Sequence, residues 1–83
     1  MNIQDLNRND TLKCKVTGVN DKGCFLKIIG LNNENIVGRI FNIYLPIDAI
    51  IIASIEKIYA EKMYMVLKLD SIDYYSDNLT IAA

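Results

Sequence analysis

An alternation of apolar and polar residues with a period of two is the feature that most constrains the fold of this chain. It begins at Thr11 and continues to residue 17, and it returns between Gly23 and residue 29. Successive side chains of a β-strand point to opposite faces, so each segment predicts a strand with one buried face. Between the two segments, the sequence GVNDKG supplies glycine, asparagine and aspartate, which favour a turn.

Three further segments are expected to form strands, at residues 36–41, 49–55 and 63–69. The second of these is rich in β-branched residues, which favour strands over helices. The connection at residues 42–48 contains the only proline and leaves room for a short helical turn. Five short strands with a long third connection predict an all-β fold, a closed five-stranded antiparallel barrel. Closure removes the exposed strand edges through which sheets aggregate.

The length of 83 residues predicts a single domain, 1–83. Within it we expect a polar lead-in at residues 1–9, the barrel at residues 10–70 and a tail at residues 71–83. The composition is 52% hydrophobic and 23% charged, which is typical of a globular protein. No signal peptide opens the chain, and no apolar run reaches the ~18 residues that a membrane span needs. We therefore expect a cytoplasmic protein that does not enter membranes.

The residue types present argue against catalysis. The chain has no histidine, the commonest general base and metal ligand. Its two cysteines, Cys14 and Cys24, are too few for a disulfide framework or a closed zinc site, and both fall on apolar strand faces. They are expected to be buried thiols, with a cross-strand disulfide as the lesser alternative. Asp21, Glu34 and Asp48 are explained as loop residues. We expect no enzyme activity, no cofactor and no metal.

The alternation divides the strand residues into an inward and an outward set. The inward set is apolar and large enough to fill a small barrel. It consists of Leu12, Cys14, Val16, Cys24, Leu26, Ile28, Ile40, Ile51, Ala53, Ile55, Met63, Met65 and Leu67. The outward set mixes rings with cations, and it consists of Lys13, Lys15, Phe25, Lys27, Arg39, Phe41, Tyr64 and Lys68.

Two outward phenylalanines suggest a function. If the second and third strands are antiparallel neighbours, Phe25 and Phe41 share an exposed face, with Lys27 and Arg39 beside them. Nucleic-acid bases stack on such rings for about 1–3 kcal/mol each, while cations follow the phosphates. Three alternatives stay open for this face. The C-terminal tail could fold back over the rings, the lysines could serve solubility alone, and Arg39 could pair with an acidic loop residue, Glu34 or Asp48.

The stretch CKVTGVNDKGCFLKI resembles the S-one type RNA-binding domain, a repeat of the OB-fold superfamily. The similarity covers residues 10–70 and is most specific over the first two strands. The matching residues are Val16, Thr17, Val19, Asp21, Gly23, Phe25 and Leu26, then Gly38, Ile40 and Phe41, and finally Ile55, Ile58, Met63, Met65 and Lys68. The resemblance implies a five-stranded OB-fold barrel that binds single-stranded RNA.

Carried over position by position, the resemblance places Phe25 at the family's stacking phenylalanine. Phe41 replaces a histidine of the third strand and keeps a flat ring, and Lys62 lies near a basic position of the last turn. Four positions depart from the family pattern, among them Asn42, which occupies an apolar position. Lys22 stands where the family has a second aromatic ring, Ile43 replaces a serine, and Tyr59 replaces an aspartate. With a formal net charge of -1, we expect binding to be weak, salt-sensitive and poorly selective for sequence.

The sequence thus predicts a small module that binds single-stranded RNA or DNA, RNA being favoured, through an outward aromatic and basic face. The candidate binding residues are Phe25, Phe41, Lys22, Lys27, Arg39, Lys13, Lys15, Lys62 and Tyr64. The alternative is an adaptor or self-associating module, with a protein partner or a second copy on the same exposed apolar face.

Overall fold

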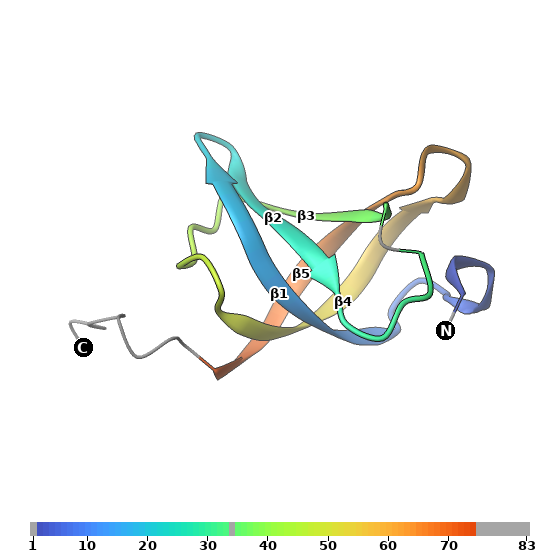
Figure 1. The fold of residues 1–83 in the computed structure, drawn as a ribbon, viewed down its shortest axis with the longest axis horizontal. Helices are drawn as coiled ribbons and strands as arrows, with labels where there is room; N and C mark the ends of the chain where they lie inside the picture. Colours follow the sequence, from blue (N-terminus) through green and yellow to red (C-terminus); the bar gives the residue numbers. More distant parts are fainter. Residues whose placement is uncertain (1, 34, 75–83) are drawn as a thin grey trace.

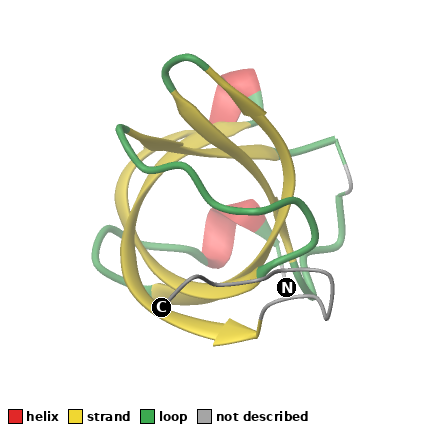
Figure 2. Cartoon of the chain, turned by 90° about the vertical axis from the view of Figure 1, so that its left-hand side faces the viewer, coloured by secondary structure: helices red, strands yellow, loops and turns green. Residues whose placement is uncertain are grey.

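The computed structural model describes residues 2–33 and 35–74, and it shows a closed β-barrel (Figures 1 and 2). The strands follow the order β1-β2-β3-β5-β4 around the ring. Their bounds are β1 Thr11–Asn20, β2 Gly23–Ile28, β3 Val37–Phe41, β4 Ile50–Tyr59 and β5 Tyr64–Tyr74, with 3-10 turns η1 at Ile3–Asp5 and η2 at Ala60–Lys62. The prediction of an all-β, five-stranded closed barrel from the alternation is therefore confirmed.

The expectation that all strands run antiparallel is wrong for one pair. β3 and β5 are parallel, with Arg39 opposite Val66, whereas each of the four other neighbouring pairs is antiparallel. The reason is topological. Antiparallel neighbours must alternate in direction around a closed ring, and five strands are an odd number, so one pair has to be parallel. A closed barrel of five strands therefore cannot be antiparallel throughout.

The last two strands are longer than the sequence pattern indicated. β4 continues past residue 55 to Tyr59, and β5 continues past residue 69 to Tyr74. The two strands pair with each other from Tyr59 opposite Tyr64 to Ile50 opposite Tyr74, with three shifts of register along the way. Each shift is a point at which the period of two loses its phase. A pattern-based assignment therefore ends too early.

The short helical turn expected between the third and fourth strands is absent. The described connector at residues 42–49 contains one bend and one turn but no helix. The thiol of Cys24 holds this segment in place. Its Sγ donates to the Ile43 carbonyl at 3.0 Å and accepts from the Leu45 amide at 3.1 Å. Leu45 also precedes Pro46, and a residue before proline disfavours helical backbone angles.

The core contains every predicted inward residue except one. Met63 was expected inside, but it is 42% exposed because it lies in the turn before β5 with a left-handed φ of 52°. Cys14 and Cys24 are both fully buried and free, which confirms the buried-thiol interpretation. The lead-in also contributes, because Ile3 and Leu6 are each only 9% exposed and belong to the core cluster.

Gly23 sets how closely β2 approaches β3. Its φ is +146°, and a Cβ at this position would stand 2.0 Å from the carbonyl oxygen of Ile40. Only glycine can accommodate both the backbone angle and this contact. Because Gly23 lies opposite Phe41 in the ladder, it also fixes where the Phe41 ring emerges on the outer face.

Candidate nucleic-acid interface

The outward face of β2, β3 and β5 brings the predicted rings together. β2 and β3 are antiparallel, Phe25 lies opposite Arg39, and Phe41 follows two residues along β3. These three residues therefore share one face, as the sequence predicted. Across the parallel pair, Val37 lies opposite Tyr64, so the same face continues onto β5.

Phe25, Arg39 and Phe41 form a phenylalanine cluster in which the cation is covered. The guanidinium carbon Cζ of Arg39 lies 4.0 Å from the ring centroid of Phe25 and 4.9 Å from that of Phe41. Arg39 is only 9% exposed, whereas Phe41 is 41% exposed and Phe25 is half-buried. Arg39 is thus buried against the two rings and is not the open cation that an outward strand position suggested.

The hydrogen bonds of Arg39 are few. Its Nη2 donates to the side-chain oxygen Oδ1 of Asn20 at 3.2 Å, and its Nε is buried without a partner among the described residues. Of the two acidic residues considered as its partner, only Asp48 belongs to the described residues. Asp48 instead lies 3.4 Å from the ammonium of Lys15, and Glu34 is outside the described residues.

Tyr59, Lys62 and Tyr64 form a second group, the tyrosine cluster, around the η2 turn. Tyr59 ends β4 and Tyr64 begins β5, and the two are paired directly across the ladder. Their rings are stacked, with centroids 5.8 Å apart and an interplanar angle of 25°. The Lys62 ammonium lies 5.8 Å from the Tyr59 ring centroid, and Lys62 is exposed. Here the cation stays at the rim.

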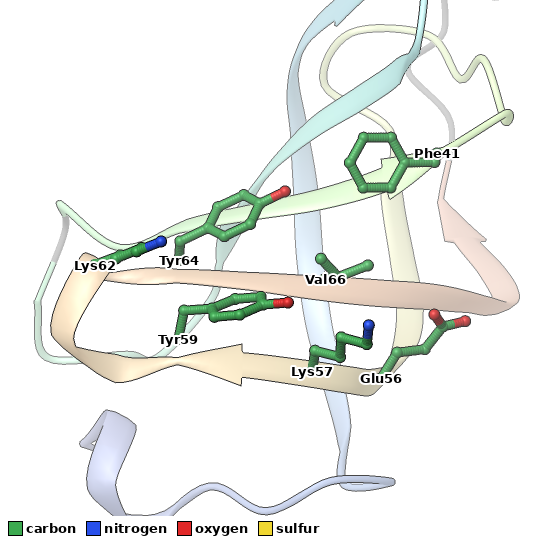
Figure 3. Close-up of a pocket in the computed structure, with 7 residues that line it drawn as sticks. All are labelled: Phe41, Glu56, Lys57, Tyr59, Lys62, Tyr64 and Val66. Carbon is green, nitrogen blue, oxygen red and sulfur yellow. The ribbon is translucent and has the colours of Figure 1, made fainter.

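A groove of about 550 Å³ connects the tyrosine cluster with Phe41 (Figure 3). Figure 3 shows the rings on one side of the sheet, with Val66 between Phe41 and the two tyrosines. The lining residues are Phe41, Glu56, Lys57, Tyr59, Lys62, Tyr64 and Val66. Three rings and two lysines against one carboxylate give the groove stacking surfaces with a local excess of positive charge.

The remaining predicted cations lie elsewhere. Lys13 and Lys15 project from β1, which lies between β2 and β4 in the ring and so faces away from the junction of β3 with β5. Lys27 lies opposite Lys15 across β1 and β2, at the end of β2 farther from the β1–β2 turn. Lys22 is exposed in that turn, where its carbonyl accepts from the Asn42 amide at 2.8 Å. None of these four lysines lines the groove.

The sequence-based prediction of binding residues missed one ring and one cation of the groove, Tyr59 and Lys57. Both lie on the part of β4 that continues past Ile55, where a register shift between Ile55 and Lys57 leaves two successive residues exposed. This bulge interrupts the alternation at the point where the fourth strand was taken to end. Resuming the count after Glu56 would have placed Lys57 and Tyr59 on one face.

The C-terminal tail, considered above as a cover for the rings, lies largely outside the described residues, which end at Tyr74. The part that is described, up to Tyr74, continues β5 and pairs with the first residues of β4.

The Cys14 thiol and the acidic side chains were the remaining groups with possible reactive or metal-binding roles. Burial raises the pKa of the Cys14 thiol to about 12, so this sulfur is a poor nucleophile at neutral pH. The described part of the chain contains no group of three or more His, Cys, Asp or Glu side chains positioned to hold a metal ion. Within the same residues, no helix is long and apolar enough to cross a membrane.

The architecture defines the chain as a small five-stranded closed β-barrel with one parallel pair and an aromatic groove on its outer wall. No protein-family model matches it, and no curated protein matches it in sequence. A solved structure of similar fold is that of an uncharacterized protein from Methanocaldococcus jannaschii, with a TM-score of 0.65 and 20% sequence identity. The similarity covers 80% of this chain and 95% of that one, and it supports the barrel architecture alone.

Proposed function

We propose that this chain is an OB-fold barrel of the S-one type that binds single-stranded nucleic acid along its β3–β5–β4 wall. The observation that carries the proposal is the groove of about 550 Å³, in which Phe41, Tyr59 and Tyr64 stand beside Lys57 and Lys62. The strand order, with β3 parallel to β5, agrees with an OB-type closure. The preference for RNA over DNA rests on the family resemblance of residues 10–70.

The physical basis of binding is the stacking of bases on the rings, supported by the attraction between the lysines and the phosphates. Each base that stacks on a ring contributes about 1–3 kcal/mol, and it does so whatever its sequence, because every base has a π-face. Lys57 and Lys62 would follow the phosphates, whereas Glu56 opposes them. With a net charge of -1 the barrel has no long-range attraction for a polyanion. We therefore expect weak, salt-sensitive binding of low selectivity.

The test is a titration of ¹⁵N-labelled protein with single-stranded RNA and DNA hexanucleotides at low salt. The expected shifts are largest at the amides of residues 41, 57–59 and 64–66. The double variant Phe41→Ala with Tyr64→Ala should lower affinity at least 30-fold, for two stacking interactions lost. Tyr44→Ala is the matched control, since Tyr44 is 57% exposed and is not among the groove residues. Unchanged binding by the double variant would refute stacking in the groove.

The second candidate is a protein-binding or self-associating module, and a specific observation favours it. Four apolar side chains on this wall are each between 39% and 42% exposed: Val37 and Phe41 on β3, Tyr59 at the end of β4, and Met63 directly after the η2 turn. Apolar exposure of this kind is typical of interaction surfaces. Light scattering over a range of concentrations tests self-association. A monomer that binds oligonucleotides would contradict this candidate, and a dimer that ignores them would favour it.

We propose a binding role without catalysis, in the cytoplasm. The absence of histidine from the chain and the raised pKa of Cys14 support this proposal. Incubation of labelled RNA with the protein should leave the strand intact, whether or not it is bound. Cleavage that depends on the protein concentration would overturn the proposal.

A further inference from the structure

Among the described residues, Arg39 is the one charged side chain that is buried. Its polar contacts do not explain this burial. A buried cation normally pairs with a carboxylate, and a buried N–H normally has an acceptor. Arg39 instead donates to the neutral oxygen of Asn20 at 3.2 Å, while its Nε has no partner among the described residues. Something else holds the guanidinium in place.

The two phenylalanine rings provide that interaction. Cζ of Arg39 lies over the Phe25 ring at 4.0 Å and over the Phe41 ring at 4.9 Å, which is within the range of cation–π contacts. A guanidinium is flat and of similar thickness to a nucleobase, and both stack on aromatic faces. One face of the Phe25 ring, on which a base could stack, is therefore already occupied in the free protein.

We propose that Arg39 is a displaceable substitute for a base, stacked on Phe25 until a nucleic-acid strand takes its place. On binding, a base takes the guanidinium's position on the Phe25 ring, and Arg39 turns outward to a phosphate. In that position its Nε and its charge both gain partners that the described residues do not give them. This inference rests on the proposed single-strand binding and deepens it, because it extends the bound strand from the groove onto β2.

The exchange predicts a particular salt dependence. In Arg39→Ala the Phe25 ring is open from the start, but one phosphate contact is lost. The log–log slope of affinity against salt should therefore fall by about one. At high salt, where phosphate contacts are screened, the variant should bind roughly threefold more tightly, because no stacked cation has to leave. The curves of wild type and variant should cross as salt rises. Arg39→Lys, which keeps the charge but has no flat face, should keep the wild-type slope.

A measurement on the wild-type protein makes the test independent of the variants' folding. The guanidinium carbon of Arg39 lies over two rings, so ring currents should move the resonance of the neighbouring Hδ protons upfield in the free protein. Saturation with the RNA hexamer A6 should return that resonance toward its ordinary position. A hexamer of abasic deoxyribose phosphates carries the same charge without bases, and it should leave the resonance where it is.

The outcomes separate this inference from the proposed function. If A6 binds while the Hδ resonance stays upfield, or if the salt curves converge without crossing, Arg39 is a fixed part of the platform and the exchange is wrong. If A6 binds neither wild type nor Arg39→Ala at low salt, single-strand binding itself fails and the exchange fails with it. Movement of Arg39 with A6, together with no movement by the abasic strand, establishes the exchange.

Discussion

The phenylalanine cluster and the tyrosine cluster have the same composition, two rings and one cation, yet they are built differently. In the first, Arg39 is buried against both rings and only 9% exposed. In the second, Lys62 stays exposed at 5.8 Å from the Tyr59 ring, and the groove opens beside it. The difference teaches that counting rings and cations on a face does not show which of them are accessible. In the first cluster Arg39 covers a face of each ring, whereas in the second Lys62 leaves the rings open to the groove.

The two clusters also depend on different backbone features. The phenylalanine cluster needs the close approach of β2 to β3 at Gly23, opposite Phe41. The tyrosine cluster needs the η2 turn, which is capped by Met63 with a left-handed φ of 52°. Each backbone feature can be altered by a substitution that leaves the rings in place. The two clusters can therefore be compared through backbone variants as well as through variants of the rings and cations.

The largest effect is expected at Gly23. A Cβ there would stand 2.0 Å from the Ile40 carbonyl oxygen at a backbone angle that side chains rarely adopt. Gly23→Ala should lower the free energy of unfolding by about 3 kcal/mol or more, from strain and overpacking together. Urea denaturation measures the change.

Gly30→Ala is the matched control, because Gly30 has a φ of +87° but an added Cβ would meet no other atom within 4 Å. It carries the backbone strain without the clash, and it should lose about 1–2 kcal/mol. Equal losses at the two glycines would show that β2 and β3 can separate easily. The phenylalanine cluster would then not depend on their close approach.

The next largest effect concerns the rings themselves. Tyr59→Ala combined with Tyr64→Ala should weaken binding of an RNA hexamer about 30-fold or more, because both rings line the open groove. Phe25→Ala should weaken binding less than about threefold. The stacking energy that a base gains on Phe25 is nearly offset by the cation–π energy that Arg39 loses when it is displaced. Fluorescence anisotropy of a labelled hexamer measures both. A Phe25 effect as large as that of the tyrosine pair would remove the distinction between the clusters.

This asymmetry shows what could be predicted from the sequence and what could not. Alternation placed Phe25 and Phe41 on one outward face, because a strand's period of two depends on local backbone geometry alone. It could not show that Arg39 is buried between them, since that depends on a side chain lying across to a neighbouring strand. It also missed Tyr59 and Lys57, because the bulge after Ile55 shifts the phase of β4. The OB-type assignment and the binding role stay predictions.

A smaller effect is expected from the cations. Lys57→Gln and Lys62→Gln should each lower the slope of log affinity against log salt by about one, and weaken binding several-fold at low salt. Both residues line the groove. Lys15→Gln serves as the control on the opposite wall, where Lys15 lies 3.4 Å from Asp48. A slope change at Lys15 equal to that at Lys62 would mean that the strand wraps around the barrel and does not stay in the groove.

The smallest effect is expected at Met63, and it has the opposite sign to the change at Gly23. Met63 is 42% exposed and has a left-handed φ of 52°, an angle that glycine adopts without strain. Its carbonyl accepts from the Val37 amide at 3.0 Å, and this bond does not need the side chain. Met63→Gly should therefore raise the free energy of unfolding by up to about 1 kcal/mol. Affinity for the hexamer should stay within about twofold, because the turn that positions Tyr59 and Tyr64 is preserved.

Glu61→Gly provides the contrast within the same turn. Glu61 is exposed and its φ is not positive, so glycine relieves no strain there and only adds freedom to the unfolded chain. This variant should lose about 0.5–1 kcal/mol. Thermal denaturation of the two variants side by side compares the signs. If Met63→Gly loses stability as Glu61→Gly does, the Met63 side chain contributes packing that outweighs the strain at its backbone. The tyrosine cluster would then depend on the packing of the Met63 side chain, as the phenylalanine cluster depends on the packing of Arg39.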